Sequence, residues 1–463
     1  MNMNINKFLL TYLFFIAFGQ ILFSQNSAPI QLSMKEAQEY ALKNNYTIKN
    51  SLIDLELAKK KIWETTAMGL PQLNAASGYT HIFKIPEVSF PSTVLSKFRT
   101  TNTLYGLPVA GDSLFVNKYD SPPIKLGVAD NVTLDVTLSQ LVFSGAYLVG
   151  LQASRVFYQM SERALEKNEI DLKESVANTY LLILNLVQNE KILSDRISNL
   201  EKILSEMKQL NKAGFIELTD IDQLELTVLT VKNAQTTLLR QIEGAKDLLK
   251  FQIGMPFENK IELSEKLDLV LDAAVIESIN DRTLEPENNI VSKIFDTQIE
   301  LAELNLKREK SNYLPNLAAF YRHSEKLKQA DFDFTMKDMA GLQLNIPIFS
   351  SGQRKSAVQQ RKLDMVKIQN NKNLAVNGLQ LEFTTAKNDF KSSVDRFYNE
   401  KRNVELAERI YNKTLIKYKE GLSSSMDITN AQNQLLSAQS NYFTAIYSML
   451  VAKNKIDKLT NKL

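Results

Sequence analysis

Apolar side chains recur every seven residues along much of the chain. Near the C-terminus one such row starts at Ile428, and a second row starts three positions later. The members of the two rows are Ile428, Leu435, Tyr442, Met449, Ile456 and Ala431, Ala438, Ala445, Ala452, Leu459. Two rows spaced in this way are the a and d positions of a coiled coil. The pattern predicts a long helix over residues 424–460 that packs against other helices.

Three further segments carry comparable rows and are predicted to be long helices: 146–213, 216–254 and 353–420. The apolar positions are Leu193, Ile197, Leu200, Leu204, Met207; Ile221, Leu224, Val228, Val231, Leu238, Ile242, Ala245, Leu249; and Phe383, Phe390, Phe397, Val404, Tyr411, Tyr418, with Gln235 as an exception. A helix from Gly145 to Gly214 is about 100 Å long at 1.5 Å per residue. Such a rod does not form a compact globule, so it must lie beside other rods.

The sequence contains an internal duplication. Two pairs of glycines are each 69 positions apart, and a shift of 207 relates the pairs: Gly145 with Gly214, and Gly352 with Gly421. The same shift carries Asp220 onto Asp427, so each copy contains a Gly-x5-Asp turn between long helices. A glycine followed by an aspartate is also typical of a helix C-cap followed by an N-cap. Both readings of the aspartates, capping and function, stay open.

A second repeat lies upstream, where Leu70-Pro71 corresponds to Leu314-Pro315 with a shift of 244. The first copy therefore holds 37 extra residues, and the proline-containing stretch 84–125 is where we place them. We predict a first structural repeat over 25–255 and a second over 287–463. Residues 256–286 form the linker between them.

Between the Leu-Pro and Gly breaks the apolar period changes from seven to two, which is typical of strands. The alternating apolar positions include Leu73, Ala75, Tyr79; Val132, Leu134, Val136, Leu138; Leu317, Ala319, Tyr321; and Leu342, Leu344, Ile346, Ile348. We predict strands near 72–83, 131–143, 316–325 and 340–349. Each is about ten residues, the length of a tilted strand that crosses a bilayer.

Four strands cannot enclose a water-filled lumen, and open strand edges are not tolerated in lipid. If the strands cross a membrane, several copies of the chain must share them. A soluble hairpin at the end of a coiled-coil stalk is the alternative.

The N-terminus resembles a secretory signal, with Lys7 before an apolar core at 8–18 and small polar residues around Ser24. We expect cleavage near residue 24; an uncleaved anchor is the alternative. The net charge is +3 without a dense basic block, so nucleic acid is not expected as a partner. The chain has no cysteine and only His81 and His323, which leaves little for a metal site. We find no nucleophile elbow, phosphate loop or paired-acid motif, and predict neither enzyme activity nor a cofactor.

Taken together, the duplication, the Leu-Pro breaks, Phe143-Ser144-Gly145, Phe349-Ser350-Ser351-Gly352 and the Gly-x5-Asp turns resemble the TolC-type outer-membrane efflux family. The resemblance implies a mainly α fold with a β-barrel part. Duplicated coiled-coil helices would form a trimeric α-helical barrel in the periplasm, and four transmembrane strands per chain would share a twelve-stranded barrel in the outer membrane of a Gram-negative bacterium.

The resemblance also implies a function and partners. The chain would be a passive exit duct of a tripartite efflux pump or a type I secretion system. A periplasmic adaptor would dock at the turns of Gly214 and Gly421, and an inner-membrane transporter of the RND, ABC or MFS type would supply the energy. The alternative is a periplasmic coiled-coil adaptor or a structural stalk.

The family's gating positions are carried over by alignment of the turns. Asp427 matches an acidic ring at the pore constriction, where crowding of three carboxylates should raise the pKa of each. A second acidic position falls on Asn430. Tyr418 and Gln209 match a hydrogen-bonded pair between tip helices. Asp220 matches the acid of an ion pair whose arginine position holds Ser423, so this lock is expected to be missing.

Overall fold

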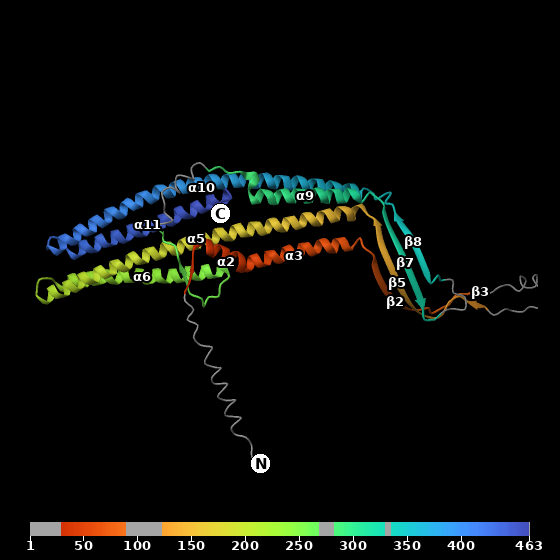
Figure 1. Cartoon of the computed structure of the whole chain (residues 1–463), viewed down its shortest axis with the longest axis horizontal. Helices are drawn as coiled ribbons and strands as arrows, with labels where there is room; N and C mark the ends of the chain where they lie inside the picture. Colours follow the sequence, from red (N-terminus) through yellow and green to blue (C-terminus); the bar gives the residue numbers. More distant parts are fainter. Residues whose placement is uncertain (1–28, 89–122, 268–281, 329–334, 463) are drawn as a thin grey trace, which may run out of the picture. The chain divides into compact units, whose positions relative to one another are not determined.

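The computed structural model describes residues 29–88, 123–267, 282–328 and 335–462 (Figure 1). The predicted signal, most of the 84–125 stretch and much of the 256–286 linker lie outside these ranges. The described chain consists mainly of long helices together with one four-stranded sheet, so the predicted mixture of long helices and strands is confirmed. Among the described residues, no helix has both the length and the apolar character needed to cross a membrane.

The chain divides into two compact units that do not coincide with the two repeats. The first unit, the helical unit, takes in residues up to 58, 157–300 and 366 onward. The second, the strand unit, takes in 59–156 and 301–365. Each unit therefore draws on both copies of the repeat, as expected when duplicated halves interleave.

Within its described residues, the helical unit contains three whole helices and the larger part of two long ones. These are α2 (Met34–Asn44), α6 (Leu218–Ile253), α11 (Ser425–Leu459), and most of α5 (Gly145–Lys212) and α10 (Gln353–Lys419). The first halves of α3 (Tyr46–Ala67) and α9 (Ile290–Ser311) belong to it as well, with the 3-10 turn η1 (Pro286–Asn288). Strand β1 (Ile30–Leu32) pairs in parallel with β6 (Ile261–Leu263).

The seven-residue rows supply much of the buried core of this unit. Buried positions include Ile428, Leu435, Met449 and Ile456 on α11; Leu224, Val228 and Val231 on α6; Leu200 and Met207 on α5; and Phe383, Phe390 and Tyr411 on α10. Gln235, the exception in its row, donates a 2.9 Å hydrogen bond to Glu190 Oε1 on α5. Its polar group is thereby satisfied between the helices.

The strand unit is built around an antiparallel sheet of four strands, in the order β2-β5-β7-β8 (Figure 1). The strands are β2 (Gln72–His81), β5 (Asp130–Phe143), β7 (Asn316–Lys326) and β8 (Asp338–Asn345). A short antiparallel pair, β3 (Glu87–Val88) and β4 (Ile124–Lys125), lies between β2 and β5 in sequence. The expectation of a strand through 349 is too long, because β8 ends two residues before Pro347. Proline has no N–H to donate to a strand ladder.

The register places mostly apolar side chains on one face of the sheet and mostly polar side chains on the other, although His81, Asp130, His323, Glu325 and Asp338 share the first face. One face, the apolar face, carries Leu73, Ala75, Ser77, Tyr79; Val132, Leu134, Val136, Leu138; Leu317, Ala319, Tyr321; and Ala340, Leu342, Leu344. The other carries polar side chains such as Asn74, Thr80; Thr133, Asp135, Thr137; Arg322, Ser324; and Gln343. Within the described sheet, β2 and β8 are the two edges.

Candidate functional site

Two tight turns connect the long helices of the helical unit. We call residues 213–217, between α5 and α6, the first tip turn, and residues 420–424, between α10 and α11, the second tip turn. Gly214 and Gly421 have φ angles of +80° and +73°, the left-handed conformation that glycine adopts at little cost. Their N–H groups bond to the carbonyls of Asn211 and Tyr418 at 2.8 and 2.9 Å. Both glycines thus close a helix C-terminus.

The second tip turn leads into a complete capping box. Ser424 Oγ accepts from the Asp427 N–H at 3.2 Å, and Asp427 Oδ2 accepts from the Ser424 N–H at 2.9 Å. Ser423 Oγ also donates to Asp427 Oδ2, at 3.0 Å. The backbone and side-chain hydrogen bonds from Ser424, followed by that from Ser423, lower the pKa of Asp427 below its usual value. Asp427 is therefore the third residue of the helix rather than its N-cap.

The first tip turn lacks this box, although the duplication places Glu217 at the position of Ser424. Glu217 is the N-cap of α6 and makes no side-chain capping hydrogen bond. Asp220, the counterpart of Asp427, instead accepts a hydrogen bond from Ser425 Oγ on α11. The two aspartates that match in sequence thus have different partners: one caps its own helix, and the other joins two helices.

Asp220 is the first member of a polar ladder between α6 and α11, which we call the inter-hairpin ladder. It consists of Asp220, Gln223 and Thr227 on α6 and of Ser425 and Thr429 on α11. Ser425 is buried, and its Oγ also lies 3.2 Å from Gln223 Oε1. Thr227 is buried too, and its Oγ1 lies 2.9 Å from Thr429 Oγ1. The ladder holds together two helices that belong to different copies of the repeat.

The opposite side of the tips joins α5 to α10. Tyr418 Oη donates to Met207 Sδ at 3.3 Å, whereas Gln209 lies exposed two residues further along α5. Burial, and after it the charge of Asp220, raises the pKa of Tyr418. Nearer the middle of the helices, the Arg196 guanidinium stands 5.0 Å from the centre of the Tyr411 ring and 3.7 Å from Glu408. The sequence analysis did not single out Arg196, because no pattern in the sequence indicates which residue of α10 it contacts.

The tips also present polar and apolar side chains to solvent. Asp427 and Asn430 are exposed and lie one helical turn apart on α11. The side chains of Phe215 and Leu422, one residue beyond each turn glycine, are 79% and 73% exposed. Leu218 and Met426 at the starts of the following helices are exposed as well. Apolar groups of this size at exposed turns are typical of a surface that a partner covers.

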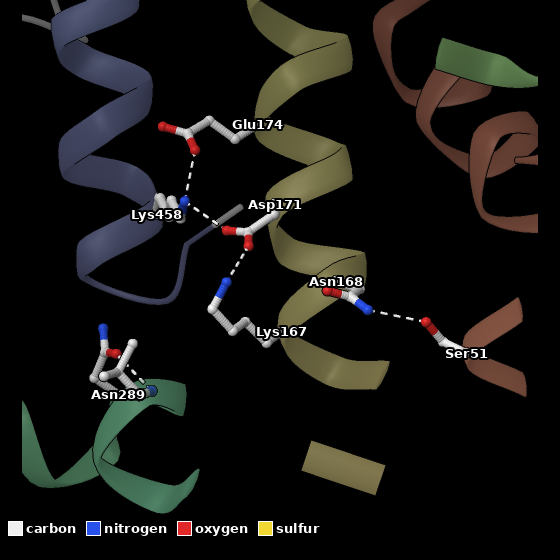
Figure 2. A network of polar contacts seen from close by, with 8 residues as sticks. Ser51, Lys167, Asn168, Asp171, Glu174, Asn289 and Lys458 are labelled. Carbon is white, nitrogen blue, oxygen red and sulfur yellow. Dashed lines mark hydrogen bonds and ion pairs between the residues drawn. The ribbon is translucent and has the colours of Figure 1, made fainter. Parts of the chain in front are cut away.

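A second polar network holds the other end of α11 (Figure 2). Lys458 Nζ lies 2.6 Å from Asp171 Oδ1 and 2.7 Å from Glu174 Oε2, both on α5. Lys167 bonds the same aspartate at 2.5 Å. Burial favours neutral forms here, but the hydrogen bonds prevail: the pKa of Lys458 is raised and the pKa of Asp171 is lowered. One turn away on α5, Asn168 donates to Ser51 Oγ on α3 at 2.9 Å.

The described residues hold no group of three or more histidine, aspartate and glutamate side chains placed to bind a metal ion. His81 and His323 each bond an aspartate on a neighbouring strand, at 2.7 Å.

Comparisons with known proteins bear on the family and the fold. Residues 296–462 match the sequence model of the outer membrane efflux protein family. Among solved structures, CusC is 14% identical with a TM-score of 0.70, covering 95% of each chain. The Campylobacter jejuni outer membrane channel CmeC is 15% identical with a TM-score of 0.67, over 93% of this chain and 85% of that one. The Vibrio cholerae outer membrane protein VceC is 14% identical with a TM-score of 0.65, over 92% and 95%. A comparison with curated protein sequences finds no match.

Proposed function

We propose that the chain, of which residues 296–462 match the outer membrane efflux protein family, is the outer-membrane exit duct of a tripartite efflux pump or a type I secretion system. In this role it is a passive conduit without catalytic activity. The observation that carries the proposal is the four-stranded sheet with one apolar face, joined in sequence to two pairs of very long helices. A periplasmic adaptor or a structural stalk, the alternative, has no need of such strands.

The edges of the sheet support assembly with further copies of the chain, and we propose a homotrimer. Strands β2 and β8 each pair on one side only within the described sheet, so each leaves a row of backbone N–H and C=O groups. In lipid these groups must be paired, and a neighbouring copy can pair them. Three copies that share their strands would enclose a lumen lined by the polar face, with the apolar face toward lipid.

The tips are the proposed gate. The inter-hairpin ladder holds α6 to α11, and Tyr418 and Arg196 hold α10 to α5. Asp427 and Asn430 on α11 would face the axis, and three copies of the acid would favour cations there. Opening then requires that the hairpin of α5 and α6 moves away from the hairpin of α10 and α11 at the tips. In this chain the ladder takes the place of the ion pair that Ser423 cannot form.

The tip turns are the proposed docking surface for a periplasmic adaptor, which connects the duct to an inner-membrane transporter. Replacing Leu422 by Asp puts a charge where an apolar side chain would be covered. We expect export by cells to fall at least tenfold, because a buried unpaired charge is costly at an interface. Leu422→Met, which keeps an apolar side chain, is the matched control and should export normally.

Conductance in a planar bilayer tests the duct itself. The purified protein, including the Leu422→Asp variant, should form discrete channels, since the substitution affects docking and not the pore. Absence of channels from the unaltered protein would contradict the proposed function, and normal export by Leu422→Asp would contradict the docking surface alone.

A further inference from the structure

Two glutamines on α11 are buried, and no described residue satisfies their amide groups fully. Gln432 is 0% exposed, and neither its Nε2 nor its Oε1 has a hydrogen-bond partner among the described residues. Gln439 is 3% exposed, and its Oε1 likewise has no partner among them. Because both side chains are covered within a single chain, neither a second copy nor a partner protein can reach them here. These amides therefore act inside the helical unit.

Both glutamines continue the row of α11 that carries the inter-hairpin ladder. Ser425, Gln432 and Gln439 are spaced by seven residues. Seven residues are about two turns, so the three side chains lie on nearly the same face of the helix. On this face, Ser425 donates a hydrogen bond to Asp220 of α6. The next member of the row, Ile446, is buried and apolar. The polar part of the row thus belongs to the half of α11 nearer the tips.

At the matching positions, the first copy of the repeat carries exposed charges. The shift of 207 carries Glu225 of α6 onto Gln432, and Lys232 onto Gln439. Both charged side chains form ion pairs with α5, at 2.9 and 2.6 Å, and both are close to half exposed. This row of α6 is therefore solvated, whereas the matching row of α11 is covered. The buried amides are a feature of the second copy that the repeat alone does not explain.

Unpaired amides make the contact between α6 and α11 less stable than apolar side chains would. A buried polar group without a hydrogen bond costs free energy, because it has lost its bonds to water and gained none. The apolar rows of α11, with Ile428 and Leu435 in the core, favour keeping the helices together. When α11 moves away from α6, these rows lose contacts but the amides regain bonds to water. Separation therefore costs less than it would for an entirely apolar contact.

We infer that Gln432 and Gln439, which we call the amide row, are gating residues that bias the contact between α6 and α11 toward opening. The amides are buried while the inter-hairpin ladder is formed, and water pairs with them when the hairpins part. The inference rests on the proposed function, because it takes separation of the hairpins as the opening movement. It adds the residues that set how readily the duct opens: the ladder holds the helices together, and the amide row lowers the cost of parting them.

Methionine replacements test the amide row with little change of shape, because methionine is unbranched and flexible and adapts to the space it fills. The double variant Gln432→Met with Gln439→Met keeps the contact packed and removes its unpaired atoms. We expect the fraction of time that single channels in a planar bilayer spend open to fall about tenfold. Hydrogen exchange at the backbone amides of 428–440 should slow by a similar factor. Gln434→Met is the matched control, since Gln434 is exposed on the same helix, and it should change neither quantity.

A charged replacement tests the opposite direction. Gln432→Glu should increase the open fraction, because a buried unpaired carboxylate costs more than an amide and gains more from water. The inference is overturned if the open fraction of the double methionine variant is unchanged, even where exchange slows, since the amides would then affect stability alone. An equal fall in the open fraction of Gln434→Met would overturn it too. Absence of channels from the unaltered protein would instead contradict the proposed function.

Discussion

At the scale of single residues, the two tip turns show how duplicated positions acquire different roles. Asp220 and Asp427 match in the repeat, yet Asp427 closes a capping box and Asp220 bonds Ser425 on another helix. The difference follows from the residue three positions earlier, which is Ser424 in one copy and Glu217 in the other. A serine at the N-cap forms a capping box with the acidic residue three positions later, whereas the glutamate at the N-cap of α6 makes no side-chain capping hydrogen bond.

Replacing Glu217 by Ser should therefore redirect Asp220 toward its own helix. The start of α6 should gain about 1 kcal/mol from the new cap, and Ser425 should lose part of its acceptor. Hydrogen exchange should become slower at the amides of 218–221 and faster at those of 425–429. Ser424→Ala is the reciprocal control, since it should speed exchange at the start of α11 without slowing that of α6. Slower exchange at both helix starts after Glu217→Ser would show that the two roles do not compete.

At the scale of elements, the spacing of apolar residues in the sequence is enough to predict most of the helices and strands. Ile428 and Leu435 are buried as a seven-residue row requires, and Leu134 and Val136 alternate with polar residues as a two-sided strand requires. The same rows do not predict the buried Gln432 and Gln439, because α11 is covered by more than the one neighbour that a two-row pattern describes. The end of β8 was missed for a local reason, the proline at 347.

Less of the candidate site than of the fold could be predicted from the sequence. The turn glycines could be located from the repeat, and their left-handed conformation follows from the residue type. The partners of Asp220 and Tyr418 could not, since a hydrogen bond between distant segments leaves no periodic trace. Ser425 looks like any residue of a polar turn, and Met207 looks like a core position.

The inter-hairpin ladder can be locked covalently, because Thr227 and Thr429 face each other across α6 and α11 and the chain has no cysteine of its own. The double variant Thr227→Cys with Thr429→Cys should form a disulfide under oxidising conditions. If the ladder must part for opening, we expect export to fall at least tenfold and to recover on reduction. The single variants are the controls. Full export by the oxidised, fully cross-linked protein would exclude ladder separation as the opening movement.

At the scale of the whole molecule, the sheet edges are the feature that a single chain leaves incomplete. β2 and β8 are the edges of the described sheet, and a closed assembly would pair β8 of one copy with β2 of the next. The long helices of the helical unit share two buried clusters within one chain, but they also leave large apolar side chains exposed, among them Leu226, Leu374 and Leu381.

Cross-linking can count the copies. A double variant with Ser77→Cys on β2 and Leu342→Cys on β8 places one thiol near each edge, on the same face. Treatment of membranes with a short bis-maleimide should give bands of two and three chains, because a ring of three closes without a free edge. Each single variant should give no trimer band. A ladder that continues beyond three chains, or monomers alone, would contradict the trimer.

The ion pairs of Lys458 have a mechanical consequence. They fix the C-terminal end of α11 against α5, whereas the ladder at its N-terminal end is made of a few short side chains. A helix held in this way acts as a lever with its pivot at the charged end. Its 35 residues span about 50 Å, so a tilt of about 5° would displace its N-terminal end by roughly 5 Å. A small rotation at the pivot would be enough to widen the constriction proposed at the tips.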